Sequence, residues 1–459
     1  MMEAERAIKT VIEMGAEYVD VRIERERSTV IEMKDGVLRD ATVGLDLGAG
    51  IRVLFDGSWG FYTTNDISKL KDGVLKAFKL AKAHKNEKKV KILPSEPLRE
   101  EFVLRVREPV EDVGIDEKIS LIEGAHKALK MEDERIKNAS VHYRDSVIER
   151  EFLSSDGSDI RMHLCYISMG LRAVASEGGD LQEAQERLGA FTGFELIRDR
   201  DLEEVAGAVT RRALRLLDAR TPPAGKLPIV MDGKLLGVFV HEALGHAAEA
   251  DLVIAGESIL SGRIGEKIGS EVLRIYDDPS IPHTHGYYPF DDEGVRSRRT
   301  AIIEDGILKS YLQTRSSAAE LGMSPTANAR AEDYSQVPIA RMSNILIEQG
   351  DFGFEELIED IKMGIYAKGM RGGQVDTVGG NFQFTAEEAF LILDGELRES
   401  IRNLSLAGST LEVLRKIDGL GKEVTGSIGF CGKNGQHVPV SESGPDARVS
   451  EMLVGGINA

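Results

Sequence analysis

Asp-Gly pairs between alternating segments constrain the fold of this chain more than any other feature of the sequence. Residues 18–24 and 50–55 alternate between apolar and polar side chains, which is the period-two pattern of half-buried strands. Asp35-Gly36 and Asp56-Gly57 lie between such strands, and these residue types readily adopt the positive backbone angles of a tight hairpin. The N-terminal part of the chain is therefore predicted to form an antiparallel sheet.

Helical segments flank these strands, and the order of segments then repeats. Residues 3–14 show the apolar spacing of an amphipathic helix, and Asp66 is a predicted N-cap for a helix that extends to Leu80. A second set of segments follows, with helices near residues 116–131 and 201–217 and strands between residues 141 and 175.

Two short sequence matches connect the first set of segments to the second. Asp35-Gly36 corresponds to Asp156-Gly157. Gly50-Ile-Arg corresponds to Gly170-Leu-Arg at nearly the same offset along the chain. We interpret these matches as an internal quasi-duplication within the N-terminal domain.

The predicted domain boundary is the segment Arg-Thr-Pro-Pro-Ala-Gly-Lys at residues 220–226, because proline and glycine there separate two periodic regions. At 459 residues the chain exceeds the usual size of one hydrophobic core, so we expect two domains, residues 1–222 and 223–459. The second begins with a predicted strand, a cap at Asp232-Gly233 and a helix over residues 234–250. The predicted fold class is α+β, with an N-terminal helix-and-antiparallel-sheet domain followed by a strand-rich C-terminal domain that carries this helix.

The acidic composition and the scarcity of cysteine exclude several classes of function. The net charge of −19 repels phosphate backbones and anionic lipid surfaces, so neither direct nucleic-acid binding nor membrane association is expected. We find no segment with the pattern of a transmembrane helix or a secretory signal, and the expected location is the cytoplasm. The two cysteines, Cys165 and Cys431, are too few for a disulfide framework. Cys165 is expected to be a buried structural residue.

The sequence His241-Glu-Ala-Leu-Gly-His246 is the candidate catalytic motif. Its histidines are one residue further apart than in the usual helix of a zinc peptidase. In a regular α-helix, residues five apart are separated by about 140° around the axis, so the imidazoles would not converge on one ion. Gly245 lowers the cost of a π turn or kink that would bring them together. We therefore predict a break in α-helical hydrogen bonding between His241 and His246; the alternative is two histidines that are hydrogen-bonded in an apolar core.

A hydrolytic zinc site also needs a third protein ligand and an open position for water. The candidates for this ligand are Glu249, Asp251 and Cys431, the last within the glycine-rich segment at residues 429–435. Glu249 and Asp251 could instead hold the imidazoles by hydrogen bonds. Glu242 is the predicted general base, which takes a proton from the attacking water and passes it to the leaving amine.

Two loop features are weaker candidates. Asp291, Asp292 and Glu293 form a run of three carboxylates that could contact a substrate or an ion, although a solvated turn is the favoured interpretation. His283 and His285 form a loop pair without a third ligand, which favours an incidental arrangement over a metal site.

Over nearly its whole length the chain resembles the TldD/PmbA family of metalloproteases. The segments that carry the resemblance are Asp56-Gly-Ser-Trp-Gly-Phe, His241-Glu-Ala-Leu-Gly-His with its following Glu-Ala-Asp, Asp291-Asp-Glu-Gly, Gly372-Gly-Gln-Val-Asp and Gly429-Phe-Cys-Gly-Lys-Asn-Gly-Gln. This resemblance implies zinc bound by His241, His246 and Cys431, with Glu242 catalytic. It also implies a dimer, formed with itself or with a TldE (PmbA)-like chain that lacks the metal motif.

From the motif and the resemblance we expect a zinc-dependent metalloprotease that cleaves unfolded polypeptides and peptides. Glycine-rich strand segments near residues 373–384 and 427–435 could bind such extended chains by main-chain hydrogen bonds. One alternative is a non-catalytic regulatory or binding subunit with a structural metal, which a fourth protein ligand would favour. Another alternative is a metal-dependent hydrolase of a non-peptide bond.

Overall fold

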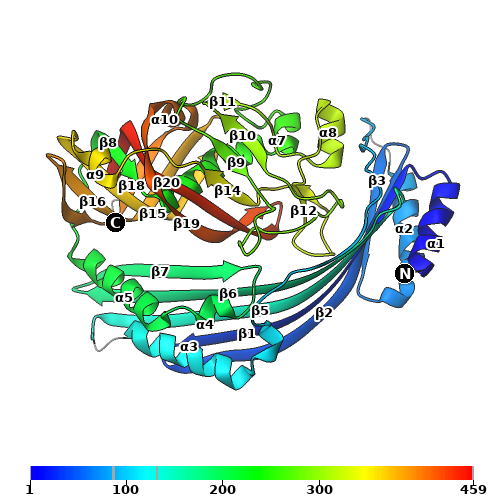
Figure 1. The fold of residues 1–459 in the computed structure, drawn as a ribbon, viewed down its shortest axis with the longest axis horizontal. Helices are drawn as coiled ribbons and strands as arrows, with labels where there is room; N and C mark the ends of the chain where they lie inside the picture. Colours follow the sequence, from blue (N-terminus) through cyan, green and yellow to red (C-terminus); the bar gives the residue numbers. More distant parts are fainter. Residues whose placement is uncertain (1, 85–87, 131–132, 457–459) are drawn as a thin grey trace.

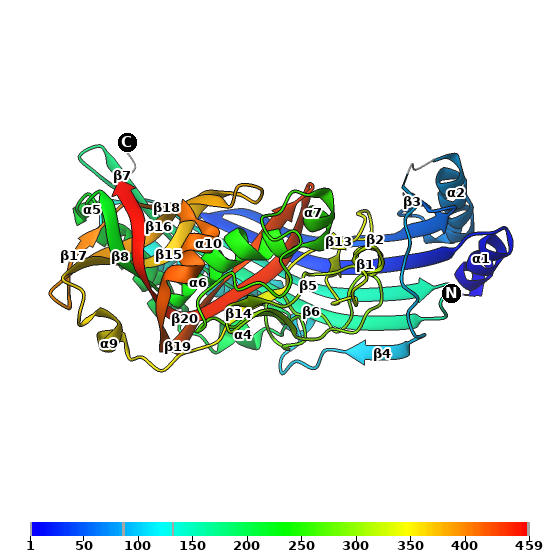
Figure 2. The ribbon, with the colours of Figure 1, turned by 90° about the horizontal axis from the view of Figure 1, so that it is seen from above.

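The computed structural model describes residues 2–84, 88–130 and 133–456, which form two layers. A long, curved and mostly antiparallel sheet from the N-terminal part forms the lower layer of Figure 1, and a mixed sheet with helices forms the upper layer. Figure 2 shows that the lower sheet extends beyond the upper layer toward α1 (Met2–Glu13) and α2 (Leu70–Ala83). The fold class is α+β, as the sequence predicts.

Seven strands form the N-terminal sheet in the order β3-β2-β1-β5-β6-β4, and β7 pairs with β6. Neighbouring strands are antiparallel, except that β4 is parallel to β6. The strands are β1 (Tyr18–Lys34), β2 (Val37–Phe55), β3 (Ser58–Thr64), β4 (Arg99–Val103), β5 (Ile136–Ser154), β6 (Asp159–Glu177) and β7 (Asp180–Ala190).

The elements of this layer occur twice in the order helix, three strands, helix. In the first half, α1 precedes β1, β2 and β3, and α2 follows them. In the second half, α3 (Ile115–Lys130) precedes β5, β6 and β7, and α5 (Leu202–Asp218) follows. Asp35 and Gly36 form the β1–β2 turn with φ angles of 52° and 81°, and Gly157 lies in the corresponding β5–β6 turn with a φ of 96°. The 3-10 turns Ile67–Lys69 and Val110–Asp112 and the short α4 (Glu195–Arg198) complete the layer.

Each half of the sheet has its own apolar core. At one end, α1 and α2 cover the strands and bury residues such as Ile51 and Val74. At the other end, α3 and α5 bury residues such as Leu171 and Val209. The two helix pairs therefore stabilise opposite ends of one continuous sheet.

Eleven strands form the C-terminal sheet in the order β11-β10-β9-β14-β20-β18-β16-β15-β8. In addition, β17 pairs with β16 and β19 pairs with β20, and the pairing of β8 with both β15 and β20 closes five strands into a ring. The strands are β8 (Gly225–Met231), β9 (Ile275–Asp277), β10 (Thr300–Glu304), β11 (Ile307–Leu308), β14 (Asn344–Ile347), β15 (Met363–Asp376), β16 (Asn381–Leu393), β17 (Glu396–Ile401), β18 (Leu404–Ser409), β19 (Ile417–Lys433) and β20 (Gln436–Gly456). A separate pair consists of β12 (Ala329–Arg330) and β13 (Ile339–Ala340).

Helix α6 (Gly233–Val240) packs into the apolar core of this layer and fixes the start of the candidate motif. The ring of Phe239 contacts those of Phe382 and Phe384, with centroids 5.1 and 6.2 Å apart. The other α-helices of the layer are α7 (Ala250–Ala255), α8 (Arg315–Leu321), α9 (Phe354–Ile358) and α10 (Thr410–Lys416). Among the helices in the described ranges, none is long and apolar enough to cross a membrane.

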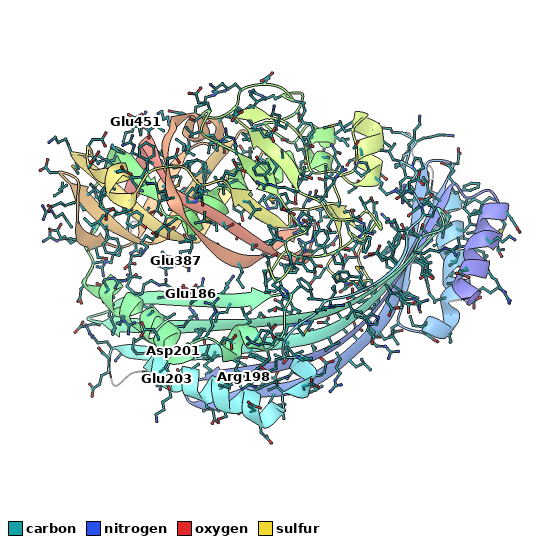
Figure 3. All side chains as sticks on the ribbon, viewed as in Figure 1. Glu186, Arg198, Asp201, Glu203, Glu387 and Glu451 are labelled. Atoms are coloured by element: carbon teal, nitrogen blue, oxygen red, sulfur yellow. The ribbon has the colours of Figure 1, made fainter. Side chains whose placement is uncertain are left out.

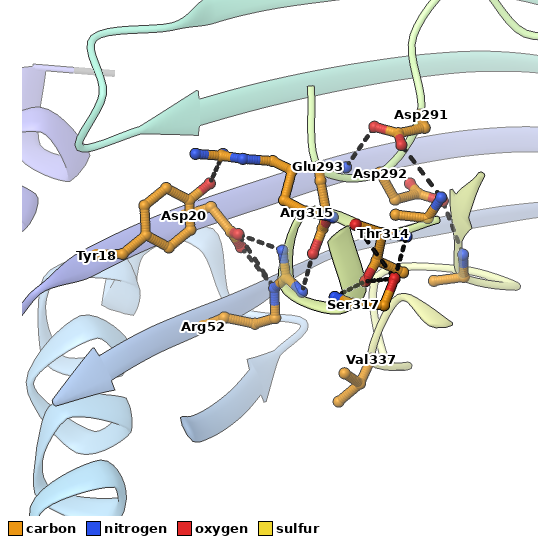
Figure 4. A network of polar contacts seen from close by, with 12 residues as sticks. Tyr18, Asp20, Arg52, Asp291, Asp292, Glu293, Thr314, Arg315, Ser317 and Val337 are labelled. Carbon is orange, nitrogen blue, oxygen red and sulfur yellow. Dashed lines mark hydrogen bonds and ion pairs between the residues drawn. The ribbon is translucent and has the colours of Figure 1, made fainter. Parts of the chain in front are cut away.

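A buried network of ion pairs joins the two layers (Figure 4). Arg52 on β2 binds the carboxylate of Asp20 on β1 and also contacts Oε1 of Glu293 at 3.0 Å. Arg315 at the start of α8 donates to the Tyr18 hydroxyl at 2.9 Å and pairs with Asp156. Strands of the lower sheet are thereby connected directly to loops of the upper layer.

The carboxylates at residues 291–293 belong to this network, so their interpretation as a solvated turn is wrong. Asp291 and Glu293 are only 4% and 2% exposed. Asp291 accepts hydrogen bonds from backbone amides, Asp292 pairs with Arg22, and Glu293 pairs with Arg52. The local sequence does not reveal this, because the arginines that pair with Asp292 and Glu293 lie more than 200 residues away in the chain.

Replacing Arg52 with Met is expected to lower the free energy of unfolding by about 3–5 kcal/mol, because it leaves Asp20 and Glu293 buried without a cation. Urea denaturation followed by circular dichroism measures this change. Lys362→Met, at an exposed pair with Asp394, is the matched control and should have little effect. Equal stability of wild type and Arg52→Met would contradict a stabilising role of the network.

Candidate metal centre

The candidate motif lies where α6 changes its winding. Asp232 caps α6, because its Oδ1 accepts a hydrogen bond of 2.8 Å from the Leu235 amide. The helix continues as a π-helical turn over His241–Gly245, in which the His246 amide donates to the carbonyl of His241. A 3-10 turn, His246–Ala248, follows. The predicted break in α-helical hydrogen bonding is therefore confirmed.

The π turn brings the two imidazoles together. Their ring centroids lie 5.3 Å apart and their planes are 87° apart. A regular α-helix would separate these two positions by about 140° around its axis. The extra residue in the turn therefore compensates for the wide spacing of the motif.

Gly245 provides space for a neighbouring side chain and does not use the backbone freedom of glycine, which differs from the prediction. Its φ of −59° and ψ of −50° are ordinary right-handed helical values. A Cβ atom at this position would lie 2.0 Å from the sulfur of Met342. The glycine thus allows the turn to pack against the segment that contains Met342.

Cys431 on β19 completes a group of three candidate ligands. The ligand atoms of His241, His246 and Cys431 all lie within 4.8 Å of one another. Sγ of Cys431 lies 3.4 Å from Nε2 of His246, and the cysteine is 5% exposed. Two imidazoles and one thiolate are ligands that zinc prefers, and three of them leave a position open for water. The geometry and the donor types therefore fit a catalytic metal.

The electrostatics of the group favour a deprotonated thiol. Burial alone would raise the pKa of Cys431, but hydrogen bonds and positive charge from His241 and His246 outweigh burial and lower that pKa to about 5. Burial lowers the pKa of His246, whereas Glu249 and Cys431 outweigh it and raise the pKa to about 10. The two neighbouring imidazoles thus favour the thiolate, which is the metal-binding form of cysteine.

Glu249 and Asp251, the alternative ligands, have other contacts. Oε2 of Glu249 lies 2.9 Å from Nδ1 of His246, and it also pairs with Lys433 at 2.9 Å. Glu249 thereby contacts an imidazole as the sequence suggested. Asp251 instead binds Lys433 at 2.7 Å, and it is not part of the group of three.

Glu442 also contacts the group, although its sequence context does not predict this. Its Oε1 lies 3.1 Å from Nδ1 of His241, and the residue is 5% exposed. Glu442 lies on β20, almost 200 residues from the motif. The alternating Val-Pro-Val-Ser-Glu sequence at residues 438–442 predicts a strand but gives no sign of a histidine partner.

A cavity of about 220 Å³ opens onto the metal centre between the two layers. His241, Glu242 and Cys431 line it from the upper layer, together with segments of β15 and β19. Residues 185–187 of β7 line it from the lower layer. Figure 3 shows Glu387 and Glu186 on these facing layers. Asp291, Asp292 and Glu293 do not line this cavity. Asp292 and Glu293 pair with Arg22 and Arg52 instead, and Asp291 accepts hydrogen bonds from backbone amides.

The remaining histidine and cysteine candidates are either hydrogen-bonded to other groups of the protein or buried. Nδ1 of His285 lies 3.0 Å from the Val440 carbonyl, and burial lowers the pKa of His285 to about 4, so the ring is neutral. His283 contacts the hydroxyl of Thr192 at 3.1 Å. Cys165 is buried in the N-terminal sheet, and burial raises its pKa to about 11. Among the described residues, the group of candidate ligands consists of His241, His246 and Cys431 and does not include these three.

Comparison with protein families places this chain in a known group of enzymes. Residues 224–456 match the PmbA/TldA metallopeptidase C-terminal domain. Residues 19–84 match domain 1 of the same metallopeptidases, and residues 108–217 match their central domain. The chain belongs to the PmbA/TldD metallopeptidase family.

Relatives of this PmbA/TldD family member align over almost their full length. A metalloprotease from Methanothermobacter thermautotrophicus is 44% identical over 445 residues, which cover 97% of both chains. A zinc metalloprotease TldD homolog from Saccharolobus solfataricus is 32% identical and covers 98% of this chain and 99% of its own. Full-length identity at these levels shows that the chain is a metalloprotease.

A solved structure has the same fold as this PmbA/TldD family member. TldE from Thermococcus kodakarensis superposes with a TM-score of 0.80 and 22% identity, covering 99% of this chain and all of that chain. The two-layer arrangement is therefore shared beyond the range of close sequence similarity.

Proposed function

We propose that this metalloprotease uses zinc held by His241, His246 and Cys431 to cleave unfolded polypeptides and short peptides. The observation that carries this proposal is the π turn, which brings the two histidines within 4.8 Å of the cysteine on β19. The name of the 32% identical relative, a zinc metalloprotease, supports zinc as the metal. A group of three ligands favours a catalytic centre over a structural one.

The residues around the centre have separate roles in the proposed reaction. Zinc, when bound, supplies Lewis-acid catalysis and lowers the pKa of water. Glu242 follows His241 directly and lines the cavity, where its side chain is 37% exposed. We assign it the general-base role: it accepts a proton from the attacking water and delivers it to the leaving amine. Glu249 holds the ring of His246 through Nδ1.

Three strand edges around the cavity support an extended peptide as the substrate. The first edge is the segment 369–372 of β15, which lies beyond the residues of β15 that pair with β8. The second is the segment 427–431 of β19, a strand that pairs with β20 alone among the described strands. On the opposite side, β7 pairs with β6 alone among the described strands. Such edges bind a peptide by main-chain hydrogen bonds, so selection by side chains should be weak.

The zinc-loaded protein is expected to cleave a disordered polypeptide at many sites and to leave a stable globular domain intact. A folded domain cannot present an extended segment to a centre that lies between two layers. Both substrates are incubated with the protein and with Glu242→Gln, and the fragments are identified by mass spectrometry. Equal cleavage of the two substrates, or fragments produced by Glu242→Gln, would count against the proposed substrate class.

We also propose that the active protein is a dimer, formed either with itself or with a TldE-like chain. The family resemblance supports this assembly, and a structure of TldE shares the fold. Sedimentation velocity of the chain expressed alone, and mixed with a TldE-like chain, is expected to show a dimer in at least one case. A monomer with full protease activity would contradict the proposal.

A further inference from the structure

The two histidines of the metal centre differ in what their second ring nitrogen contacts. Nδ1 of His246 forms a hydrogen bond of 2.9 Å with Glu249, which is also paired with Lys433. Nδ1 of His241 is fully buried and faces Oε1 of Glu442 at 3.1 Å. This contact has the length of a hydrogen bond but not its angle, and Nδ1 has no other hydrogen-bond partner in the described structure.

Glu442 is a buried carboxylate, and His241 is one of the few polar groups that contact it. It is 5% exposed, and its Oε2 accepts a hydrogen bond of 3.3 Å from the Ser427 hydroxyl. Within the described residues, no lysine or arginine forms an ion pair with it. A buried carboxylate requires hydrogen bonds or a cation nearby, and the imidazole of His241 is the group placed to provide them.

Two glycines allow α6 to approach the strand that carries Glu442. Gly237 and Gly233 precede His241 by one and two helical turns, so all three residues lie along one face of the helix. A Cβ atom at Gly237 would lie 2.8 Å from Cβ of Glu442, and one at Gly233 would lie 1.9 Å from the carbonyl oxygen of Gly444. The distance between His241 and Glu442 is therefore set by glycine in the preceding turns.

We propose that Glu442 is a positioning residue for His241, an inference that rests on the proposed zinc site. In the zinc-bound protein, Glu442 would accept a hydrogen bond from Nδ1–H, the group that faces it at 3.1 Å, and would thereby fix the tautomer and the orientation in which Nε2 is free to bind the metal. Gly237 is required because a larger residue would push the helix away from Glu442. Glu249 differs from Glu442 in its partners. It forms an ion pair with Lys433 in addition to its hydrogen bond with His246.

Zinc affinity measured by competition with a chromophoric chelator tests this inference without relying on enzymatic activity. Glu442→Gln keeps a hydrogen-bond acceptor but removes the charge, and we expect its zinc dissociation constant to rise about 10-fold. Glu442→Leu removes the acceptor too, and we expect a rise of about 100-fold. Gly237→Ala should also weaken zinc binding. The visible absorption of the cobalt-substituted protein should change in all three variants, because the orientation of His241 changes.

Matched controls separate this inference from the proposed zinc site. Glu451→Gln makes the same substitution on the same strand at a side chain that is 44% exposed, and Gly124→Ala places a Cβ in open space in helix α3. Both should keep the affinity and the cobalt spectrum of wild type. Wild-type values for both Glu442 variants, alongside loss of zinc in His241→Ala, would overturn the role of Glu442 and leave the zinc site intact. Retention of zinc by His241→Ala would instead refute the zinc site.

Discussion

Replacing Glu242 with Gln is expected to abolish peptide hydrolysis while one zinc ion per chain is retained. The side chain lines the cavity, and its Oε2 lies 3.9 Å from Nε2 of His246 without belonging to the ligand group. An amide cannot accept the proton of the attacking water, and loss of a general base lowers a rate by about 10²–10⁴-fold. Cleavage of a disordered polypeptide and elemental analysis of the same preparations measure both properties.

The matched control for this prediction is Glu203→Gln, which changes an exposed glutamate on α5 in the lower layer (Figure 3). It should retain both zinc and activity. Hydrolysis by Glu242→Gln at the wild-type rate would remove this residue from the catalytic mechanism. Loss of zinc from Glu242→Gln would show instead that its carboxylate helps to bind the metal.

Replacing Cys431 with Ala is expected to reduce zinc to far below one ion per chain after dialysis against a weak chelator. The substitution removes the one thiolate of the ligand group and leaves only the two imidazoles. Hydrolysis should fall together with the zinc content. Elemental analysis after dialysis measures the first effect, and the polypeptide cleavage assay measures the second.

Cys165→Ala is the control for this substitution, because Cys165 is buried in the N-terminal sheet and is not part of the group of three. It should bind zinc like wild type. Stoichiometric zinc in Cys431→Ala would refute Cys431 as the third ligand. Asp251 would then be the better candidate, and its contact with Lys433 would have to be replaced by a contact with the metal.

Features that depend on neighbouring residues could be predicted from the sequence. Alternation and Asp-Gly pairs predicted the hairpins of the N-terminal sheet, since the positive φ angles of Asp35 and Gly36 follow from local preferences. The spacing of His241 and His246 predicted the π turn, because helical geometry fixes where each side chain points. The proposed metal ligands rest on the motif together with the family resemblance, and the fold brings their ligand atoms within 4.8 Å of one another.

Features that depend on contacts between distant segments could not be predicted. Glu442 reaches His241 only because β20 lies beside α6, and nothing in the sequence around Glu442 indicates that contact. The carboxylates at 291–293 suggested a solvated turn, but the fold places Arg22 against Asp292 and Arg52 against Glu293. Gly245 was correctly singled out, but its physical role depends on Met342, almost 100 residues away.

Zinc K-edge X-ray absorption of the wild-type protein tests the central claim most directly, because it reports the atoms bound to the metal. The proposed centre predicts one sulfur at about 2.3 Å, from Cys431, and two imidazole nitrogens at about 2.0–2.1 Å. A first shell of nitrogen and oxygen without sulfur would contradict the assignment of Cys431 and the metal centre built on it.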